Sequence, residues 1–358
     1  MAVQVSGRRL GWGGLLWRGI QIWAREGTSR AAGGSSPGQF EHVNGLLRAG
    51  QVDQAGLEAW SEPLASSRAK AQNRYRIPFR PAIGLGKLGS VAMPEFKHHN
   101  RSVSYDTLGA GPAVVFQHGL GADRRQALGT LGEVRGRRVV AMDAPGHGET
   151  VGGSGPYGFG DFADCVLGLM DHLGIESAVL GGISMGSGIG LAAALRAPKR
   201  VRALLLVRPA WLATPSPPNL EIVARIGHWI EDGGVDQARQ QLEADPFYAE
   251  LFNTNPNCAA SIAGVFTRPQ ALESARVLHQ MVDDRPFSSM GDLGEVHCPT
   301  LVVTNESDPL HPRGLGDELA RAIGGAQHEV VPPRYTAAAD HQSALTQTIQ
   351  KFLDGSCV

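Results

Sequence analysis

Residues 178–197, AVLGGISMGSGIGLAAALRA, decide the fold of this chain. They begin with a short apolar run at 178–180 and continue into a stretch with helical character that stops before Pro198. Between the two stands Gly182-Ile183-Ser184-Met185-Gly186, a G-x-S-x-G pattern in a strand–turn–helix context. Glycines are needed because the turn is too tight for side chains. The pattern predicts a sharp elbow that presents Ser184 as a nucleophile.

Short apolar runs of the same kind recur on both sides of this stretch. They lie at residues 113–116, 139–142, 203–207, 301–303 and 330–331, and an alternating run lies at 102–105. Apolar runs without alternation are typical of strands that are buried on both faces. Helical stretches lie between most of them, most clearly at 161–173 and 188–195. This alternation predicts an α/β fold with a mostly parallel central sheet flanked by helices.

A second motif, His118-Gly119-Leu120-Gly121, directly follows the strand predicted at 113–116. The carboxyl ends of parallel strands are where open α/β sheets place their ligand sites. The backbone N–H groups of Leu120 and Met185 are therefore candidates for an oxyanion hole, which stabilises charge developing on a carbonyl oxygen. We expect His118 to hold this loop. His118 and Gly119 are also candidates for the wall of a substrate pocket.

A third motif, Asn305-Glu306-Ser307-Asp308-Pro309-Leu310-His311-Pro312, follows the strand predicted at 301–303. Asp308 is placed to orient and stabilise an imidazolium ion. An Asp before Pro can also simply cap a turn. Glu306 is the competing acid, and we favour Asp308.

With these motifs in place, residues 99–353 resemble the α/β-hydrolase fold superfamily. The stretch Asp143-Ala144-Pro145-Gly146-His147-Gly148 adds to the resemblance, since it looks like the Gly-rich turn that precedes the elbow there. That turn is usually structural, so we give His147 no catalytic role. The superfamily orders its residues as nucleophile, acid and histidine along the chain. Ser184 and Asp308 fit the first two places.

Three histidines follow Asp308 and compete for the third place. We expect His311 to be too close to Asp308, three residues away, to sit between the acid and Ser184. His328 begins the last strand, at the wrong end of the sheet. By elimination His341 is the predicted base, although it lies later than the superfamily places its histidine, which usually follows the last strand within a few residues.

The resemblance also implies a helical cap. Residues 209–298 separate two predicted strands and contain helical stretches at 220–231, 235–244, 259–266 and 269–281. Caps supply apolar walls and exclude water from a pocket. Trp211 is the favoured wall residue, because it closely follows a strand end. Other large residues of the cap either line the pocket or form the cap's own core: Ile226, Trp229, Phe247, Phe252, Phe266 and Met281.

The N-terminal part of the chain differs from the rest. Residues 1–40 hold five arginines and one acid among interleaved tryptophans and leucines, and we expect a flexible basic leader. Residues 41–98 are expected to be a helical or irregular extension of the core, which spans 99–208 and 299–353. An Arg-rich, acid-poor start resembles an organellar transit peptide of the mitochondrial kind. The alternative is a surface-lying or solvated leader on a cytoplasmic protein, which we favour.

Composition limits the partners. Lys and Arg total 33 against 34 Asp and Glu, for a net charge of −1, which argues against a nucleic-acid binder. The apolar stretch near the N-terminus is broken by Arg18 and is too short to span a bilayer. The four cysteines are scattered and form no metal-ligand spacing. We therefore expect a small-molecule substrate and neither a cofactor nor a metal. The sequence leaves the oligomeric state open.

Three functions remain open at this point. The leading prediction is a serine hydrolase that cleaves an ester, thioester or amide of a small, largely apolar molecule through an acyl-enzyme. The second keeps the same triad for carbon–carbon bond hydrolysis, lyase, perhydrolase or acyl-transfer chemistry, all of which the superfamily contains. The third is a ligand-binding protein that retains the fold without catalysis.

Overall fold

The computed structural model describes residues 94–150, 155–268 and 270–355. The predicted leader at 1–40 and all of the predicted extension except residues 94–98 lie outside the described residues. Residues 95–98 differ from the prediction, because they form strand β1 (Glu95–His98), which pairs antiparallel with β2 (Arg101–Gly109). The sheet therefore begins before residue 99.

An eight-stranded sheet organises the core, in the order β1-β2-β4-β3-β5-β6-β7-β8. Strands β1 and β2 run antiparallel to their neighbours, and the other six are parallel. The parallel strands are β3 (Ala113–Gln117), β4 (Arg138–Met142), β5 (Ala178–Ile183), β6 (Val201–Val207), β7 (Thr300–Asn305) and β8 (Gln327–Val331). Every residue of β5 and β7 is buried, as expected for strands that contain the apolar runs at 178–180 and 301–303. The predicted α/β class is confirmed.

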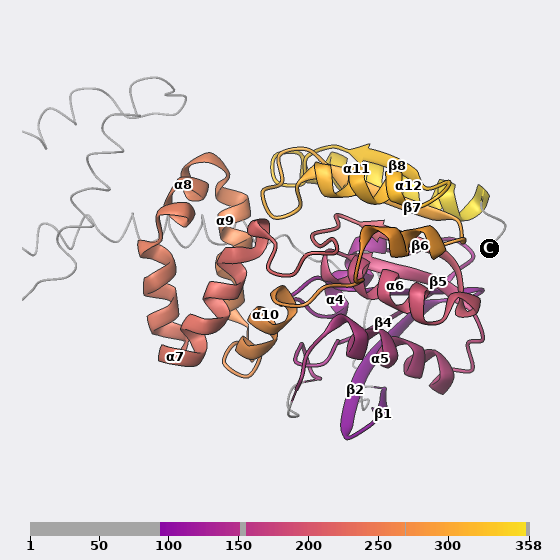
Figure 1. Cartoon of the computed structure of the whole chain (residues 1–358), viewed down its shortest axis with the longest axis horizontal. Helices are drawn as coiled ribbons and strands as arrows, with labels where there is room; N and C mark the ends of the chain where they lie inside the picture. The colour runs from indigo at the N-terminus through magenta and orange to yellow at the C-terminus, as the bar shows by residue number, and fades with distance from the viewer. Residues whose placement is uncertain (1–93, 151–154, 269, 356–358) are drawn as a thin grey trace, which may run out of the picture. The chain divides into compact units, whose positions relative to one another are not determined.

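Helices cover both faces of the sheet (Figure 1). Apolar side chains of α5 (Phe159–His172), α6 (Met185–Arg196) and α11 (Arg313–Ala322) share one buried cluster with one face of the strands. Those of α4 (Arg124–Leu131) and α12 (Ala338–Gly355) share another cluster with the opposite face. The core therefore consists of three layers, and the two clusters lie on opposite sides of the sheet.

The insertion between β6 and β7 is a helical cap with its own apolar cluster. It contains α7 (Glu221–Ala244), α8 (Pro246–Thr254), α9 (Pro256–Ala263) and α10 (Ala275–Val282). The helices predicted at 220–231 and 235–244 are the two halves of α7, which are separated by the non-helical backbone of Gly234, where φ is 76°. Helix α8 was missed, and α10 begins six residues later than predicted.

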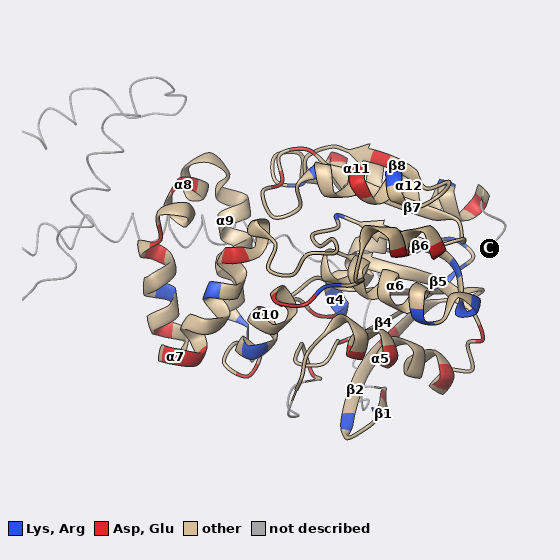
Figure 2. Ribbon diagram, in the orientation of Figure 1, with Lys and Arg blue, Asp and Glu red and all other residues tan. Residues whose placement is uncertain are grey.

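Basic and acidic residues are interspersed over the cap and the core (Figure 2). This distribution accords with the near-zero net charge. Within the described ranges, the helices are all too short or too polar to cross a membrane.

The elbow between β5 and α6 is held by close backbone packing. Ser184 has φ = 58°, in the left-handed region that side chains rarely adopt, and its N–H donates to the carbonyl of Val207 at 2.9 Å. A Cβ on Gly182 would lie 2.5 Å from the carbonyl oxygen of Gln117, and one on Gly186 would lie 2.3 Å from the same atom. Only glycine therefore fits on either side of the strained serine.

Two glycine-to-alanine substitutions test this packing. Gly182→Ala is expected to lower the free energy of unfolding by about 1–3 kcal/mol or more, because its new methyl group collides with backbone. Gly129→Ala, inside α4 with no atom near the added methyl group, is expected to raise it by about 0.5–1 kcal/mol. Urea unfolding measures both values. An unchanged stability for Gly182→Ala would contradict the packing described.

Candidate active site

Ser184, His311 and Asp308 form one hydrogen-bonded chain at the carboxyl ends of β5 and β7. The ring of His311 lies with Nε2 2.9 Å from Ser184 Oγ and Nδ1 3.0 Å from Asp308 Oδ1. All three residues are buried, with Ser184 9% exposed and His311 8% exposed. This is the arrangement of a nucleophile, a base and an orienting acid.

The structure does not place the predicted base, His341, in this chain. His341 lies in the first turn of α12, and its Nδ1 is 2.8 Å from the carbonyl oxygen of Pro332. His328 is also remote, with Nε2 2.9 Å from Thr304 Oγ1. The elimination of His311 by its nearness to Asp308 was wrong.

A tight turn explains why nearness is no obstacle. The N–H of His311 donates to the carbonyl of Asp308 at 3.2 Å, so the two residues close a four-residue turn through Pro309 and Leu310. The turn folds the imidazole back over the carboxylate of its own loop. Glu306, the competing acid, is 53% exposed at its side chain and pairs with Arg313 at 2.6 Å. Asp308 is therefore the acid that faces the site.

Arg208, a residue that sequence reasoning missed, completes the cluster. It follows β6 with φ = 49°, and its side chain is buried. Its Nε and Nη2 atoms donate to Asp308 Oδ2 at 2.8 and 2.5 Å. Burial would raise the pKa of Asp308, but the neighbouring His311 and Arg208 outweigh it and hold that pKa well below its usual value. Asp308 is therefore ionised at neutral pH.

The charges of Arg208 and Asp308 also shift the pKa of His311. Burial and the positive charge of Arg208 lower the pKa of His311, against the opposing pull of Asp308. The imidazole is therefore neutral at pH 7. Its tautomer matters, because Arg208 Nη2 lies 2.9 Å from Nδ1 and both atoms cannot donate to each other. With the proton on Nδ1 facing Asp308, Nε2 is free to accept the Ser184 hydroxyl.

Two predicted oxyanion donors lie beside Ser184. Leu120 lines the same pocket as the serine, and Met185 is the first residue of α6. In the described part of the chain, the N–H of Leu120 has no hydrogen-bond acceptor. The N–H of Met185 belongs to the first turn of a helix, where backbone donors have no partner within the helix. Their role as an oxyanion hole stays a prediction.

His118 and His147 hold the loop that carries Leu120. Nε2 of His118 accepts the N–H of Ala144 at 3.0 Å, and Nε2 of His147 accepts the N–H of Gly121 at 2.9 Å. Burial lowers the pKa of both rings, so both are neutral acceptors. His118 is 0% exposed and does not line the pocket. The prediction that His118 lines the pocket was wrong, because its ring lies between two loops, where it contacts backbone atoms of Gly119 and Ala144.

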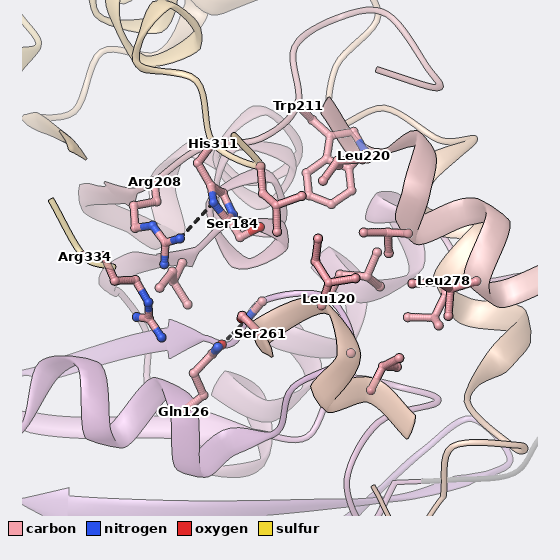
Figure 3. A pocket seen from close by; sticks show the side chains of 18 of the residues that line it. Leu120, Gln126, Ser184, Arg208, Trp211, Leu220, Ser261, Leu278, His311 and Arg334 are labelled. Carbon is pink, nitrogen blue, oxygen red and sulfur yellow. Dashed lines mark hydrogen bonds between the residues drawn. The ribbon is translucent and has the colours of Figure 1, made fainter. Parts of the chain in front are cut away.

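A cavity of about 110 Å³ opens above Ser184, between the core and the cap. Gly119 and Trp211 line it, as predicted, and Trp211 packs edge-on against Phe159 at 5.3 Å between ring centroids. Ile226 also lines it, whereas Phe247 and Phe252 are 46% and 57% exposed on the cap. Figure 3 shows Arg208 and Arg334 on one side of the pocket, facing Leu120, Leu220 and Leu278 on the other.

The segment after β8, where the resemblance leads one to expect a histidine, delivers other residues to the site. Arg334 and Tyr335 both line the cavity. The hydroxyl of Tyr335 lies 3.3 Å from Arg208 Nη2, and burial raises the pKa of Tyr335 to about 12. Tyr335 is therefore a neutral acceptor for the arginine. The only signal for this role in the sequence is its position shortly after the last strand.

Among the residues that the structure describes, one group of side chains could hold a metal ion, and it lies away from the cavity. Atoms of His228, Glu231 and His279 lie within 4.8 Å of one another on helices α7 and α10. Glu231 already contacts His279 at 2.7 Å and Arg276 at 3.2 Å. Glu231 and His279 are therefore already paired, and none of the three residues lines the cavity.

Comparison with known proteins gives a consistent result. A family model described as the alpha/beta hydrolase fold matches residues 112–336. A 2-hydroxy-6-oxononadienedioate/2-hydroxy-6-oxononatrienedioate hydrolase of Comamonas testosteroni is 28% identical over 71% of this chain and 92% of its own length. The dihydrolipoyllysine-residue acetyltransferase component of the acetoin cleaving system of Pseudomonas putida is 39% identical, but the match covers only 39% of this chain and 38% of that protein. A thermophilic esterase of Thermogutta terrifontis superimposes with a TM-score of 0.58 at 25% identity, over 72% of this chain and 94% of its own.

The electrostatics of His311 can be measured directly. Titration of its ring nitrogens by NMR is expected to give a pKa below the ordinary histidine value. Arg208→Met is expected to raise that pKa, because it removes a nearby positive charge, and Arg208→Lys is expected to restore part of the lowering. Arg208→Met should also cost about 3–5 kcal/mol of stability, since it leaves Asp308 buried with one partner fewer.

The matched control is Arg202→Met, at an exposed position on β6. It is expected to change neither the titration nor the stability by a measurable amount. A His311 pKa that stays the same in Arg208→Met would show that the guanidinium does not act on the ring.

Proposed function

The chain belongs to the α/β-hydrolase fold family and is a hydrolase, and from this we propose that it is a serine hydrolase that cleaves an ester, thioester or amide through an acyl-enzyme. The observation that carries the proposal is the distance of 2.9 Å between His311 Nε2 and Ser184 Oγ. At this distance the neutral imidazole can accept the proton of the Ser184 hydroxyl, which the elbow holds at the N-terminus of α6.

The first half of the proposed reaction forms the acyl-enzyme. Ser184 Oγ attacks the acyl carbonyl while its proton passes to His311 Nε2. Asp308 stabilises the imidazolium that results, through the Nδ1–H contact at 3.0 Å. Arg208 opposes this charge on the ring but keeps Asp308 ionised and in place. The ring then gives its proton to the leaving group as the bond to the carbonyl carbon breaks.

The second half returns the enzyme to its starting state. Water attacks the acyl carbon and gives its proton to His311, and the ring passes the proton to Ser184 as the acid product leaves. In both halves the N–H groups of Leu120 and Met185 would stabilise the oxyanion. A fixed donor of this kind typically contributes about 100- to 1,000-fold to the rate. The cap side chains around the cavity would keep other water molecules out.

Carbon–carbon bond hydrolysis is the second candidate. The relative from Comamonas testosteroni, which matches over 71% of this chain, is named as a hydrolase of a 2-hydroxy-6-oxo dienedioate, a ketone rather than an ester. The same serine, histidine and oxyanion donors can serve such a substrate. The two candidates differ in the bond that breaks, so parallel assays with 4-nitrophenyl esters and with a 2-hydroxy-6-oxo-dienoate separate them.

Labelling with a fluorophosphonate tests the nucleophile. The probe is expected to modify the wild-type protein at Ser184, as mapped by peptide mass spectrometry, and to leave Ser184→Ala unmodified. Hydrolysis of the preferred substrate should fall by about 10³-fold or more in that variant. A wild-type protein that remains unlabelled while folded would refute the acyl-enzyme.

A matched pair of substitutions tests the base. His311→Asn keeps a donor for Asp308 but removes the atom that accepts the serine proton, and kcat/KM is expected to fall by about 10²- to 10⁴-fold. His341→Asn keeps the bond to Pro332 and is expected to leave kcat/KM within about twofold. The reverse pattern would restore His341 as the base. In the wild type, kcat/KM should fall as the pH drops through the lowered pKa of His311 and stay level above it.

A further inference from the structure

The cavity over Ser184 has an unbalanced charge. Three arginines line it, namely Arg208, Arg268 and Arg334, and its lining contains no acidic side chain. The charge of Arg208 is balanced, because its guanidinium forms an ion pair with Asp308, which does not itself line the cavity. Two positive charges therefore face the cavity without a partner in its wall.

Arg334 comes from the loop after β8, and Arg268 from the segment of the cap between α9 and α10. Within the residues that the structure describes, neither guanidinium makes a hydrogen bond, an ion pair or a contact with an aromatic ring. The carboxylates whose charges act on the two arginines have other partners: Asp308 binds Arg208 and His311, and Asp123 caps the N-terminus of α4.

The surroundings of both arginines disfavour their charged forms. Burial lowers the pKa of Arg268 to about 10, and burial together with the charge of Arg208 lowers the pKa of Arg334. Both side chains are partly buried, with some exposure left to each. A cation that loses part of its water without gaining a partner is less stable than a paired one. The natural partner is an anion that enters the cavity from outside.

We propose that the substrate carries a carboxylate on an otherwise apolar body, and that Arg334 binds this carboxylate while Arg268 adds to the attraction from the cap. The inference rests on the proposed function, since it names the kind of substrate that the Ser184 site takes. A carboxylate has one charge and two oxygens, which match the fork of a single guanidinium through two parallel hydrogen bonds. A phosphate has about twice the charge and three oxygens, and would call for several donors on one side.

The rest of the lining suits the apolar body. Figure 3 shows Arg334 and Gln126 on one side of the pocket and the leucines on the other. The amide oxygen of Gln126 already accepts the N–H of Gly119 at 2.8 Å, and its amide nitrogen has no hydrogen-bond partner among the described residues. The leucines, Val223 and Ile226 offer only hydrocarbon. A molecule with one charged end and an apolar remainder complements both sides.

Kinetics with paired substrates test the proposal. Mono-4-nitrophenyl glutarate and 4-nitrophenyl pentanoate differ by a carboxylate on the acyl side, and 4-acetoxybenzoate and 4-methylphenyl acetate differ by one on the leaving group. Wild-type kcat/KM is expected to favour the charged member of at least one pair by about 10- to 100-fold. Arg334→Met should abolish this preference, Arg334→Lys should retain part of it, and Arg268→Met should reduce it to a smaller extent.

The control for these variants is Arg202→Met, which removes an exposed arginine outside the cavity and should keep the full preference. Folding is checked by the thermal midpoint. Arg334→Met removes a cation without a partner, so its Tm is expected to equal or exceed that of the wild type. Loss of a contact needed only for structure would instead lower Tm and reduce kcat/KM equally for charged and neutral esters.

Binding without turnover separates this inference from the proposed function. In Ser184→Ala, glutarate is expected to raise Tm, and in Ser184→Ala combined with Arg334→Met it should not. If no ester is cleaved but glutarate still stabilises Ser184→Ala through Arg334, the proposed reaction fails and the carboxylate site stands. A wild type that prefers neither charged ester, together with no effect of glutarate on Tm, would overturn the carboxylate site.

Discussion

The buried carboxylate of Asp308 is the group on which the site depends. One negative charge, enclosed by the protein, holds Arg208 through one oxygen and His311 through the other. These groups follow strands β6 and β7, and the serine follows β5, so three neighbouring parallel strands deliver the cluster at one edge of the sheet. Removal of the charge would leave a buried guanidinium unpaired and the imidazole without an orienting partner.

The proposed acid and base, Asp308 and His311, lie in the same four-residue turn after β7. The segment after β8 contributes Arg334 and Tyr335 to the cavity and no histidine. Tyr335 backs the guanidinium of Arg208, and Arg334 faces the space in front of the serine. The proposed relay and the proposed carboxylate site therefore lie in one cavity and use residues from different loops.

Much of the fold and part of the site follow from local pattern. The unbroken apolar runs predicted strands β3 to β8, and the glycines around Ser184 predicted the elbow, because both depend on neighbouring residues only. Asp308 was favoured over Glu306, and the structure agrees, because Glu306 is exposed and paired with Arg313 whereas Asp308 faces His311. His311 was not, because the argument from spacing ignored the reversal that Asp308 and Pro309 impose on the chain. Arg208 was missed since its role arises only from contact with a residue one hundred positions away. Helix α8, at nine residues, is too short to show a clear period.

A crystal structure of the protein after reaction with a fluorophosphonate tests the central claim most directly. The account predicts a phosphorus atom bonded to Ser184 Oγ, a phosphonyl oxygen within hydrogen-bond distance of the N–H groups of Leu120 and Met185, and His311 between the adduct and Asp308. An adduct contacted by His341, or by no histidine at all, would contradict the relay of Ser184, His311 and Asp308.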